Sequence, residues 1–165
     1  MVGGWSYRKG CDLIVEAIQK TNYKFLHVGS IVDLPFPDSS QFVHFDSVDQ
    51  DLLIYFYNMA KVFILPSREE GLAMVQAQAL ACGLPLIGSK DSGAEDILNL
   101  LGAKCYVGIL SEYTASCLID EINKCMAYVN SNDDVKTVVN GLSNFSWSAY
   151  ARRYNDFITK IAYDR

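Results

Sequence analysis

A short loop between two apolar runs carries a carboxylate and a glycine directly before a stretch of helix-forming residues. Glu70 and Gly71 follow the apolar residues 62–65 and precede residues 72–82, which contain no glycine or proline. Glycine lets a ligand approach the backbone, and the unpaired N–H groups at the start of a helix attract an anion such as a phosphate. A carboxylate beside that anion needs another partner, and sugar hydroxyls are good ones.

The elements around this loop are predicted to be a strand, a helix and a second strand. Residues 62–65 have the composition of a strand buried on both faces, and Pro66 ends it because proline has no N–H for a ladder. Residues 72–82 form a helix that Gly83 and Pro85 bring to an end. Gln78 then lies about two turns into the helix, and residues 86–88 form the next strand.

A second group of charged residues, Arg8 and Lys9, lies near the N-terminus. They precede apolar residues at helical spacing, which predict a helix through Lys20. Cations at the start of a helix oppose its dipole. A contact with a phosphate is therefore a better explanation than a solvated helix start. Val2 has the character of the end of a strand, so we expect the chain to be part of a longer polypeptide.

The rest of the sequence predicts further strands and helices in alternation. Strands are expected at residues 24–29, 41–45 and 104–107, with a tight turn at 89–96. Helices are expected at 49–60, 112–128, 134–142 and 147–163. This alternation predicts one Rossmann-like α/β domain over residues 1–165, with three α/β/α layers and a mostly parallel sheet. Gly29 and Ser30 follow a strand, where nucleotides bind in such sheets.

Composition excludes several classes of partner. The chain has 14 Lys and Arg against 19 Asp and Glu, so no large basic field attracts nucleic acid or an anionic membrane. Five cysteines without a Cys-x-x-Cys pair are typical of a reducing cytoplasm, and two isolated histidines argue against a metal site. No apolar run approaches the roughly 18 residues of a membrane span, and the N-terminus is unlike a signal peptide.

Two motifs resemble a known family. Residues 66–73 read Pro-Ser-x-x-Glu-Gly-Leu-Ala and residues 79–85 read Ala-x-Ala-Cys-Gly-x-Pro. Together they resemble the donor-site signature of retaining GT-B glycosyltransferases of the group 1 (family 4) class. The resemblance implies that Glu70 contacts hydroxyls of the donor sugar and that the residue eight positions later contacts the ribose. That position holds Gln78 instead of the usual glutamate, and Ala73 replaces the usual glycine.

The resemblance continues over most of the chain. Lys9 matches the lysine of the family's Lys-Gly-x-Asp element, which meets the donor diphosphate, and Phe-Ser-Trp at residues 145–147 matches a C-terminal element. Gly4 replaces the usual arginine of the glycine-rich loop, so Arg8 is a candidate for the second positive charge. The resemblance implies a UDP- or GDP-linked sugar as substrate, no cofactor or metal, and an N-terminal acceptor domain of the same polypeptide that this chain lacks.

The predicted site therefore has two catalytic residues, Lys9 and Glu70. Its predicted donor-binding residues are Arg8, Gly29, Ser30, Gly71, Leu72, Ala73 and Gln78.

Two other classes share features of this sequence. A nucleotide-sugar epimerase or a phosphorylase has the same two-domain architecture but lacks the joined Glu-Gly and Ala-Cys-Gly-x-Pro motifs. A non-catalytic nucleotide-binding module would explain Gln78, Gly4 and Ala73 as decay of the site. A dehydrogenase is disfavoured because no Gly-x-Gly-x-x-Gly joins a strand to a helix.

Overall fold

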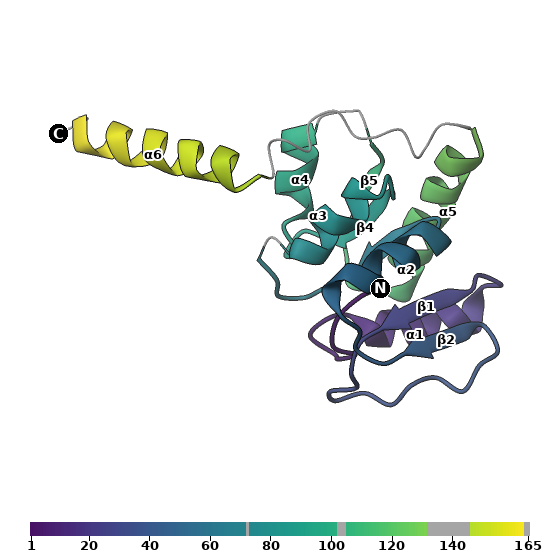
Figure 1. Ribbon diagram of the computed structural model, residues 1–165. Helices are drawn as coiled ribbons and strands as arrows, with labels where there is room; N and C mark the ends of the chain where they lie inside the picture. The colour runs from purple at the N-terminus through teal and green to yellow at the C-terminus, as the bar shows by residue number, and fades with distance from the viewer. Residues whose placement is uncertain (72, 102–104, 132–145, 164–165) are drawn as a thin grey trace.

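Strands and helices alternate from α2 to α5, as the sequence predicts, whereas β1 is followed directly by β2. The computed structural model describes residues 1–71, 73–101, 105–131 and 146–163 (Figure 1). The elements are, in order, α1 (Cys11–Lys20), β1 (Phe25–Val28), β2 (Phe42–Phe45), the 3₁₀ helix η1 (Gln50–Leu52), α2 (Leu53–Met59), β3 (Phe63–Leu65), α3 (Met74–Ala81), β4 (Leu86–Ser89), α4 (Ala94–Leu101), β5 (Val107–Leu110), α5 (Ala115–Ser131) and α6 (Trp147–Tyr163).

The strands are parallel and lie in two groups. β1 pairs with β2, with Phe25 opposite Phe42. β4 pairs with β3 on one side and with β5 on the other. Over the described ranges no ladder joins β1 to β3, so the sheet orders are β1-β2 and β3-β4-β5. Parallel strands need crossover connections: α3 connects β3 to β4 and α4 connects β4 to β5, whereas residues 29–41 join β1 to β2 without a helix.

Helices cover both faces of the strands, which confirms the three-layer α/β/α arrangement. Side chains alternate along a strand. Phe63 and Leu65 of β3 therefore lie in one buried cluster with residues of α2, α3 and α4. Ile64, between them, lies in a second cluster with residues of α1 and α5. Beyond these layers, α6 extends away from the other elements (Figure 1), and its Tyr154 is exposed.

Some predicted boundaries were wrong. Residues 89–96 were predicted to be a turn only, yet α4 begins at Ala94. Gly93 adopts φ 70° directly before it, acidic residues in its first turn suit the dipole, and Ile97 is fully buried. The strand predicted at residues 104–107 is found as β5, Val107–Leu110, and residue 104 lies outside the described residues. The helix predicted at 134–142 lies outside the described residues.

No helix within the described ranges combines the length and apolar character needed to cross a membrane.

Candidate functional site

Two loops meet where strands of the sheet end. Residues 6–10 lead into α1, and residues 66–71 follow β3. The Arg68 N–H donates to the Arg8 carbonyl at 2.8 Å. Gly10 has φ +74°, and a Cβ there would lie 2.2 Å from the Pro66 carbonyl oxygen. The loops therefore approach so closely at this point that only glycine fits.

The predicted catalytic residues Lys9 and Glu70 come together across this contact. Lys9 Nζ donates to Glu70 Oε2. Arg8 Nη1 lies 3.6 Å from the same carboxylate oxygen and donates to the Glu69 carbonyl at 2.6 Å. The Lys9 and Glu70 side chains are 13% and 19% exposed, against 51% for Arg8. Partial burial strengthens the Lys9–Glu70 attraction, whereas water screens Arg8 more fully.

An ion pair that the sequence did not predict fixes the two loops. The Arg68 guanidinium donates to both carboxylate oxygens of Asp12 at 2.7 Å, and to the Tyr7 carbonyl at 2.6 Å. It also lies 3.9 Å from the centre of the Tyr7 ring. The hydrogen bonds to Asp12 raise the pKa of Arg68. Planar, bidentate pairing of this kind holds geometry as well as charge.

Sequence alone gave no signal for this pair. Arg68 and Asp12 are 56 positions apart, and an aspartate in the first turn of a helix is ordinarily explained by the dipole. Each residue therefore had a sufficient local explanation, and only the fold shows that they meet.

The segment around Asp91, directly after β4, also contacts the loop that carries Glu70. The Glu70 N–H donates to the Asp91 carbonyl at 2.9 Å. Tyr113 donates its hydroxyl to the Asp91 carboxylate at 2.6 Å, and burial together with this bond raises the pKa of Tyr113. A cleft of about 560 Å³ opens here, lined by Arg68, Glu69, Glu70, Gly71, Lys90, Asp91, Gly93, Glu95 and Asp96.

The start of α3 has no side-chain cap. The helix begins at Met74, two residues later than predicted, and Ala73 before it is extended. The N-cap residue Ala73 has no polar side-chain atom that could cap the first turn, so N–H groups there are suited to an anion. Gly71 has open space where a Cβ would stand. Leu72, predicted to bind donor, lies outside the described residues.

Gly29 and Ser30 lie against a different part of the site. Gly29 has φ +144°, and a Cβ there would be 2.2 Å from the Gly3 carbonyl oxygen. The Ser30 carbonyl accepts from the Trp5 N–H at 2.8 Å. Both residues thus support the glycine-rich segment at residues 3–5, and their described contacts do not reach the Glu70 loop.

Gln78 is held by a neighbouring helix. Its Oε1 accepts a hydrogen bond from the Tyr57 hydroxyl at 3.1 Å, and burial raises the pKa of Tyr57. Gln76, two residues earlier, is fully buried, and its Oε1 has no partner among the described residues. Gln78 is only partly buried, so of the two glutamines it is the one that a ligand can reach.

Comparison with known proteins gives the same family as the motifs. The profile described as "Glycosyl transferases group 1" matches residues 1–136. An uncharacterized glycosyltransferase of Methanocaldococcus jannaschii is 25% identical over 154 residues, which cover 88% of this chain and 42% of that protein. The glycogen synthase of Thermodesulfovibrio yellowstonii is 25% identical over 166 residues, covering 93% of this chain and 33% of its own length.

Solved structures share the fold. The catalytic domain of starch synthase IV from Arabidopsis thaliana, bound to ADP and acarbose, matches 96% of this chain and 38% of its own, with a TM-score of 0.72 and 19% identity. HepE of Anabaena, in complex with UDP-glucose, matches 96% of this chain and 48% of its own, with a TM-score of 0.68 and 14% identity. The chain thus spans less than half the length of each of these proteins.

Proposed function

Because this chain belongs to the group 1 glycosyltransferase family, we propose that it is the donor-binding half of a retaining enzyme that transfers a sugar from a nucleotide-diphosphate sugar. The observation that carries the proposal is the contact between Lys9 Nζ and Glu70 Oε2. Two loops 61 positions apart bring a cation for phosphate and a carboxylate for sugar hydroxyls to one point. A donor presents those two chemical groups side by side.

The Lys9–Glu70 contact suggests how a donor would be bound. A diphosphate would compete with Glu70 for the Lys9 ammonium, and Arg8 lies near enough to add a second charge. Glu70, released from Lys9, would accept hydrogen bonds from the sugar. Positive charge at the diphosphate stabilises the departing nucleotide, which is where negative charge develops in the reaction.

Backbone groups would add to this positive field. The uncapped first turn of α3 and the open side of Gly71 suit the same diphosphate. With Lys9, Arg8 and the helix supplying positive charge, we infer that transfer proceeds without a divalent metal or other cofactor. We propose a UDP- or GDP-linked sugar as the donor, and the HepE complex with UDP-glucose supports the nucleotide-sugar class.

The rest of the enzyme would come from the same polypeptide. We infer an N-terminal acceptor domain, because the longer relatives exceed this chain by more than a factor of two. We place the reaction in the cytoplasm, since all five cysteines are free thiols, as in a reducing compartment. An isolated half-site binds donor weakly, and it should turn over none because the sugar stays open to water.

The test is nucleotide binding by calorimetry with three variants. Lys9→Ala should weaken nucleoside diphosphate binding by about 1–3 kcal/mol, the range for a charged hydrogen bond, and leave nucleoside binding nearly unchanged. Glu70→Gln should strengthen diphosphate binding, because Lys9 loses its competitor, and should weaken the preference for the sugar-linked form. Lys20→Ala is the control, because Lys20 is exposed and pairs with exposed Glu16 at 3.3 Å.

Equal losses of nucleoside and diphosphate binding in Lys9→Ala would reject the phosphate role. A Glu70→Gln protein that keeps the full preference for the sugar-linked nucleotide would reject the role of Glu70.

A further inference from the structure

Tyr113 joins the loop of Glu70 to the loop after β4. It lies in residues 111–114, which follow β5 at the edge of the sheet where the loops after β3 and β4 also begin, because the three strands are parallel neighbours. Its hydroxyl donates to Asp91 Oδ2 at 2.6 Å, and the Ser67 carbonyl oxygen accepts from the same hydroxyl at 3.3 Å. A hydroxyl has one proton, so the shorter bond to the charged carboxylate is the stronger of the two.

The ring of Tyr113 is held in place by Arg68. The guanidinium carbon lies 5.4 Å from the centre of this ring and 3.9 Å from that of Tyr7, and both distances suit a cation over an aromatic face. Arg68 is itself paired with Asp12. A tyrosine side chain has only two χ angles, so little freedom is left for the hydroxyl once the ring is fixed. Tyr113 is thus a rigid support.

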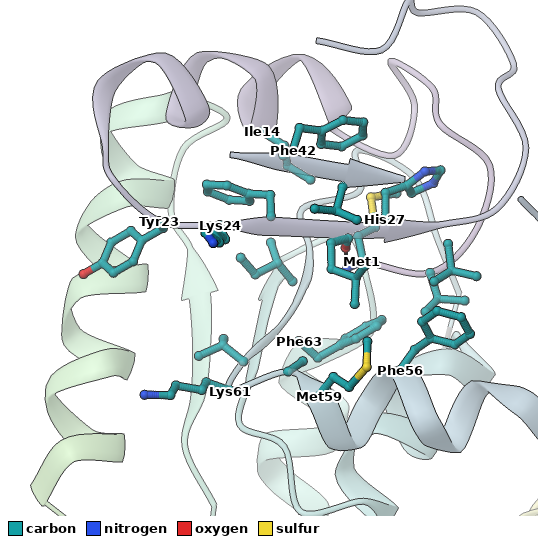
Figure 2. Close-up of a pocket in the computed structure, with 18 of the residues that line it drawn as sticks. Met1, Ile14, Tyr23, Lys24, His27, Phe42, Phe56, Met59, Lys61 and Phe63 are labelled. Carbon is teal, nitrogen blue, oxygen red and sulfur yellow. Dashed lines mark hydrogen bonds between the residues drawn. The ribbon is translucent and has the colours of Figure 1, made fainter. Parts of the chain in front are cut away.

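Support for the Glu70 loop comes from this side of the sheet. On the other side, an apolar cavity of about 500 Å³ lies between β1 and Phe63 of β3 (Figure 2), and no ladder joins these two strands in the described ranges. By contrast, β3, β4 and β5 form a continuous ladder. The loops after β4 and β5 are therefore in fixed register with β3, and they can hold the residues that follow it.

Asp91 lies at the exposed tip of the turn after β4. The two ends of this turn are anchored, because Ser89 and Ser92 are fully buried and the Ser89 N–H donates to Ser92 Oγ at 2.9 Å. Exposed loop tips move more than their anchored ends. The Asp91 carbonyl accepts the Glu70 N–H at 2.9 Å, so the position of Glu70 depends on how firmly the tip is held. The hydrogen bond from Tyr113 holds it.

We propose that Tyr113 is a positioning residue for Glu70, acting through Asp91. The Tyr113 hydroxyl fixes the Asp91 side chain, the Asp91 carbonyl fixes the Glu70 N–H, and the Glu70 carboxylate is thereby kept in place at the cleft. The positioning itself follows from these contacts alone. Its consequence for sugar binding rests on the proposed function.

The proposal separates the two halves of the Lys9–Glu70 site. Lys9 belongs to the loop at residues 6–10, whereas the Tyr113 hydroxyl bonds to residues that follow β3 and β4. Loss of the hydroxyl should therefore disturb Glu70 and leave Lys9 in place. The expected signature is a weaker preference for a sugar-linked nucleotide, with unchanged binding of the bare diphosphate.

Amide hydrogen exchange tests the positioning without any nucleotide. Tyr113→Phe removes the hydroxyl and keeps the ring against Arg68. The Glu70 amide should exchange about three- to tenfold faster, the effect of one lost hydrogen bond on local opening. Tyr106→Phe is the matched control, because Tyr106 directly precedes β5, at its other end, and donates to Glu121 Oε2 at 3.1 Å. This variant loses a bond of the same kind, and its Glu70 exchange should match that of the native chain.

Calorimetry of the same variants tests the consequence for sugar binding. The probes are UDP with UDP-glucose, and GDP with GDP-mannose. Tyr113→Phe should lower the ratio of sugar-linked to bare diphosphate affinity by about three- to tenfold, and Tyr106→Phe should leave it unchanged. If the native chain binds none of these nucleotides, the proposed function fails, and the exchange experiment still decides the role of Tyr113.

Substitutions at Asp91 separate support by Tyr113 from a direct role of the carboxylate. Asp91→Asn keeps an oxygen that accepts from Tyr113, so it should retain native exchange at Glu70 and the native affinity ratio. Asp91→Ala should lose as much as Tyr113→Phe. The double variant should lose no more than either one, because both substitutions remove the same bond.

Native exchange at Glu70 in Tyr113→Phe would overturn the proposal, as would equal acceleration in Tyr106→Phe. Additive losses in the double variant would assign Asp91 a role of its own. An Asp91→Asn protein as impaired as Asp91→Ala would do the same, and either result would also overturn the proposal.

Discussion

The loops of the candidate site and the strands beneath them are joined very differently. Above the sheet, the loops at residues 6–10 and 66–71 are linked by backbone, ionic and aromatic contacts. Beneath them, β1 and β3 share no described hydrogen bond and border a cavity. In most parallel sheets the ladder positions the loops. Here the polar contacts between the loops carry part of that task.

This difference has a consequence for the site. A pair such as Lys9 and Glu70 keeps its geometry only if the loops that carry it are fixed to each other. Arg68 provides that connection through its hydrogen bonds to Asp12 and Tyr7. The side chains of Arg68 and Asp12 are mostly shielded from water, at 21% and 27% exposed. Substitutions that break contacts between the loops should therefore lower the free energy of unfolding of the whole domain. Substitutions where the loops face open space, as at Gly71, should not.

The largest effect is expected from Gly10→Ala. Alanine is strained at φ +74°, and its Cβ would lie 2.2 Å from the Pro66 carbonyl, so the loops must separate. We expect a loss of about 3–5 kcal/mol in the free energy of unfolding, measured with urea. Gly71→Ala is the matched control, because open space surrounds its Cβ position. Similar losses in both would show that the loop contact contributes little.

The Arg68–Asp12 pair should give the next largest effect. A double-mutant cycle with Arg68→Ala and Asp12→Ala should give a coupling of about 2–3 kcal/mol in the free energy of unfolding, because two charged hydrogen bonds are partly buried. The exposed Lys20–Glu16 pair serves for comparison and should give under about 0.5 kcal/mol. An Arg68–Asp12 coupling no larger than the Lys20–Glu16 coupling would mean that other contacts hold the two loops together.

The part of the fold that sequence could predict is the part with local signals. Residues 62–88 carry an apolar run, a proline, a helix-forming stretch and a Gly-x-Pro end, and the predicted strand, helix and strand are found there. α4 was missed because a motif interpretation of residues 89–96 as a turn took precedence over the buried Ile97. The gap between β1 and β3 has no local signal, since each strand has an ordinary sequence.

The same holds for the site. Lys9 and Glu70 could be predicted because the charge of each is unfavourable in a purely structural role. A cation at the start of a helix opposes the dipole, and a carboxylate beside an anion site needs another partner. The structure brings the two side chains together. Arg68 and Asp12 gave no such signal, because an arginine in a loop and an aspartate at the start of a helix are both common. Their pairing depends on the distance between two loops, which only the packed chain defines.

The pH dependence of stability should test the contacts of β1, because His27 lies in this strand. Burial lowers the pKa of His27 to about 4, despite its hydrogen bond to the Gly3 carbonyl. The unfolded chain, with a histidine pKa near 6.5, then binds more protons between pH 6.5 and 4. Stability is therefore complete above about pH 6.5 and should fall by about 3 kcal/mol toward pH 4.

Urea unfolding across this pH range measures the effect, and His27→Gln is the control variant. Asp and Glu side chains also titrate near pH 4, so the informative quantity is the difference between the two proteins. His27→Gln should lose less stability on acidification than the native chain. Parallel pH dependences would show that His27 does not titrate in this window.

The smallest effect, and the most specific, is expected at Gln78. Gln78→Glu restores the glutamate that the family resemblance places at this position. A carboxylate would still accept the hydrogen bond from Tyr57, as Gln78 Oε1 does at 3.1 Å. If the side chain also reaches the ribose, its charge should strengthen nucleotide binding by roughly 1 kcal/mol. Desolvation of the carboxylate opposes this gain, and partial exposure of Gln78 keeps that cost small.

Gln76→Glu on the same helix is the matched control for this substitution. Gln76 is fully buried, and its Oε1 has no partner among the described residues, so a carboxylate there should lower stability with no gain in affinity. Stability by urea and nucleotide affinity by calorimetry must be measured on both variants. If Gln78→Glu behaves like Gln76→Glu, the Gln78 side chain is a structural partner of Tyr57, and the ribose contact must be sought at the other group of site residues, near Gly29 and Ser30.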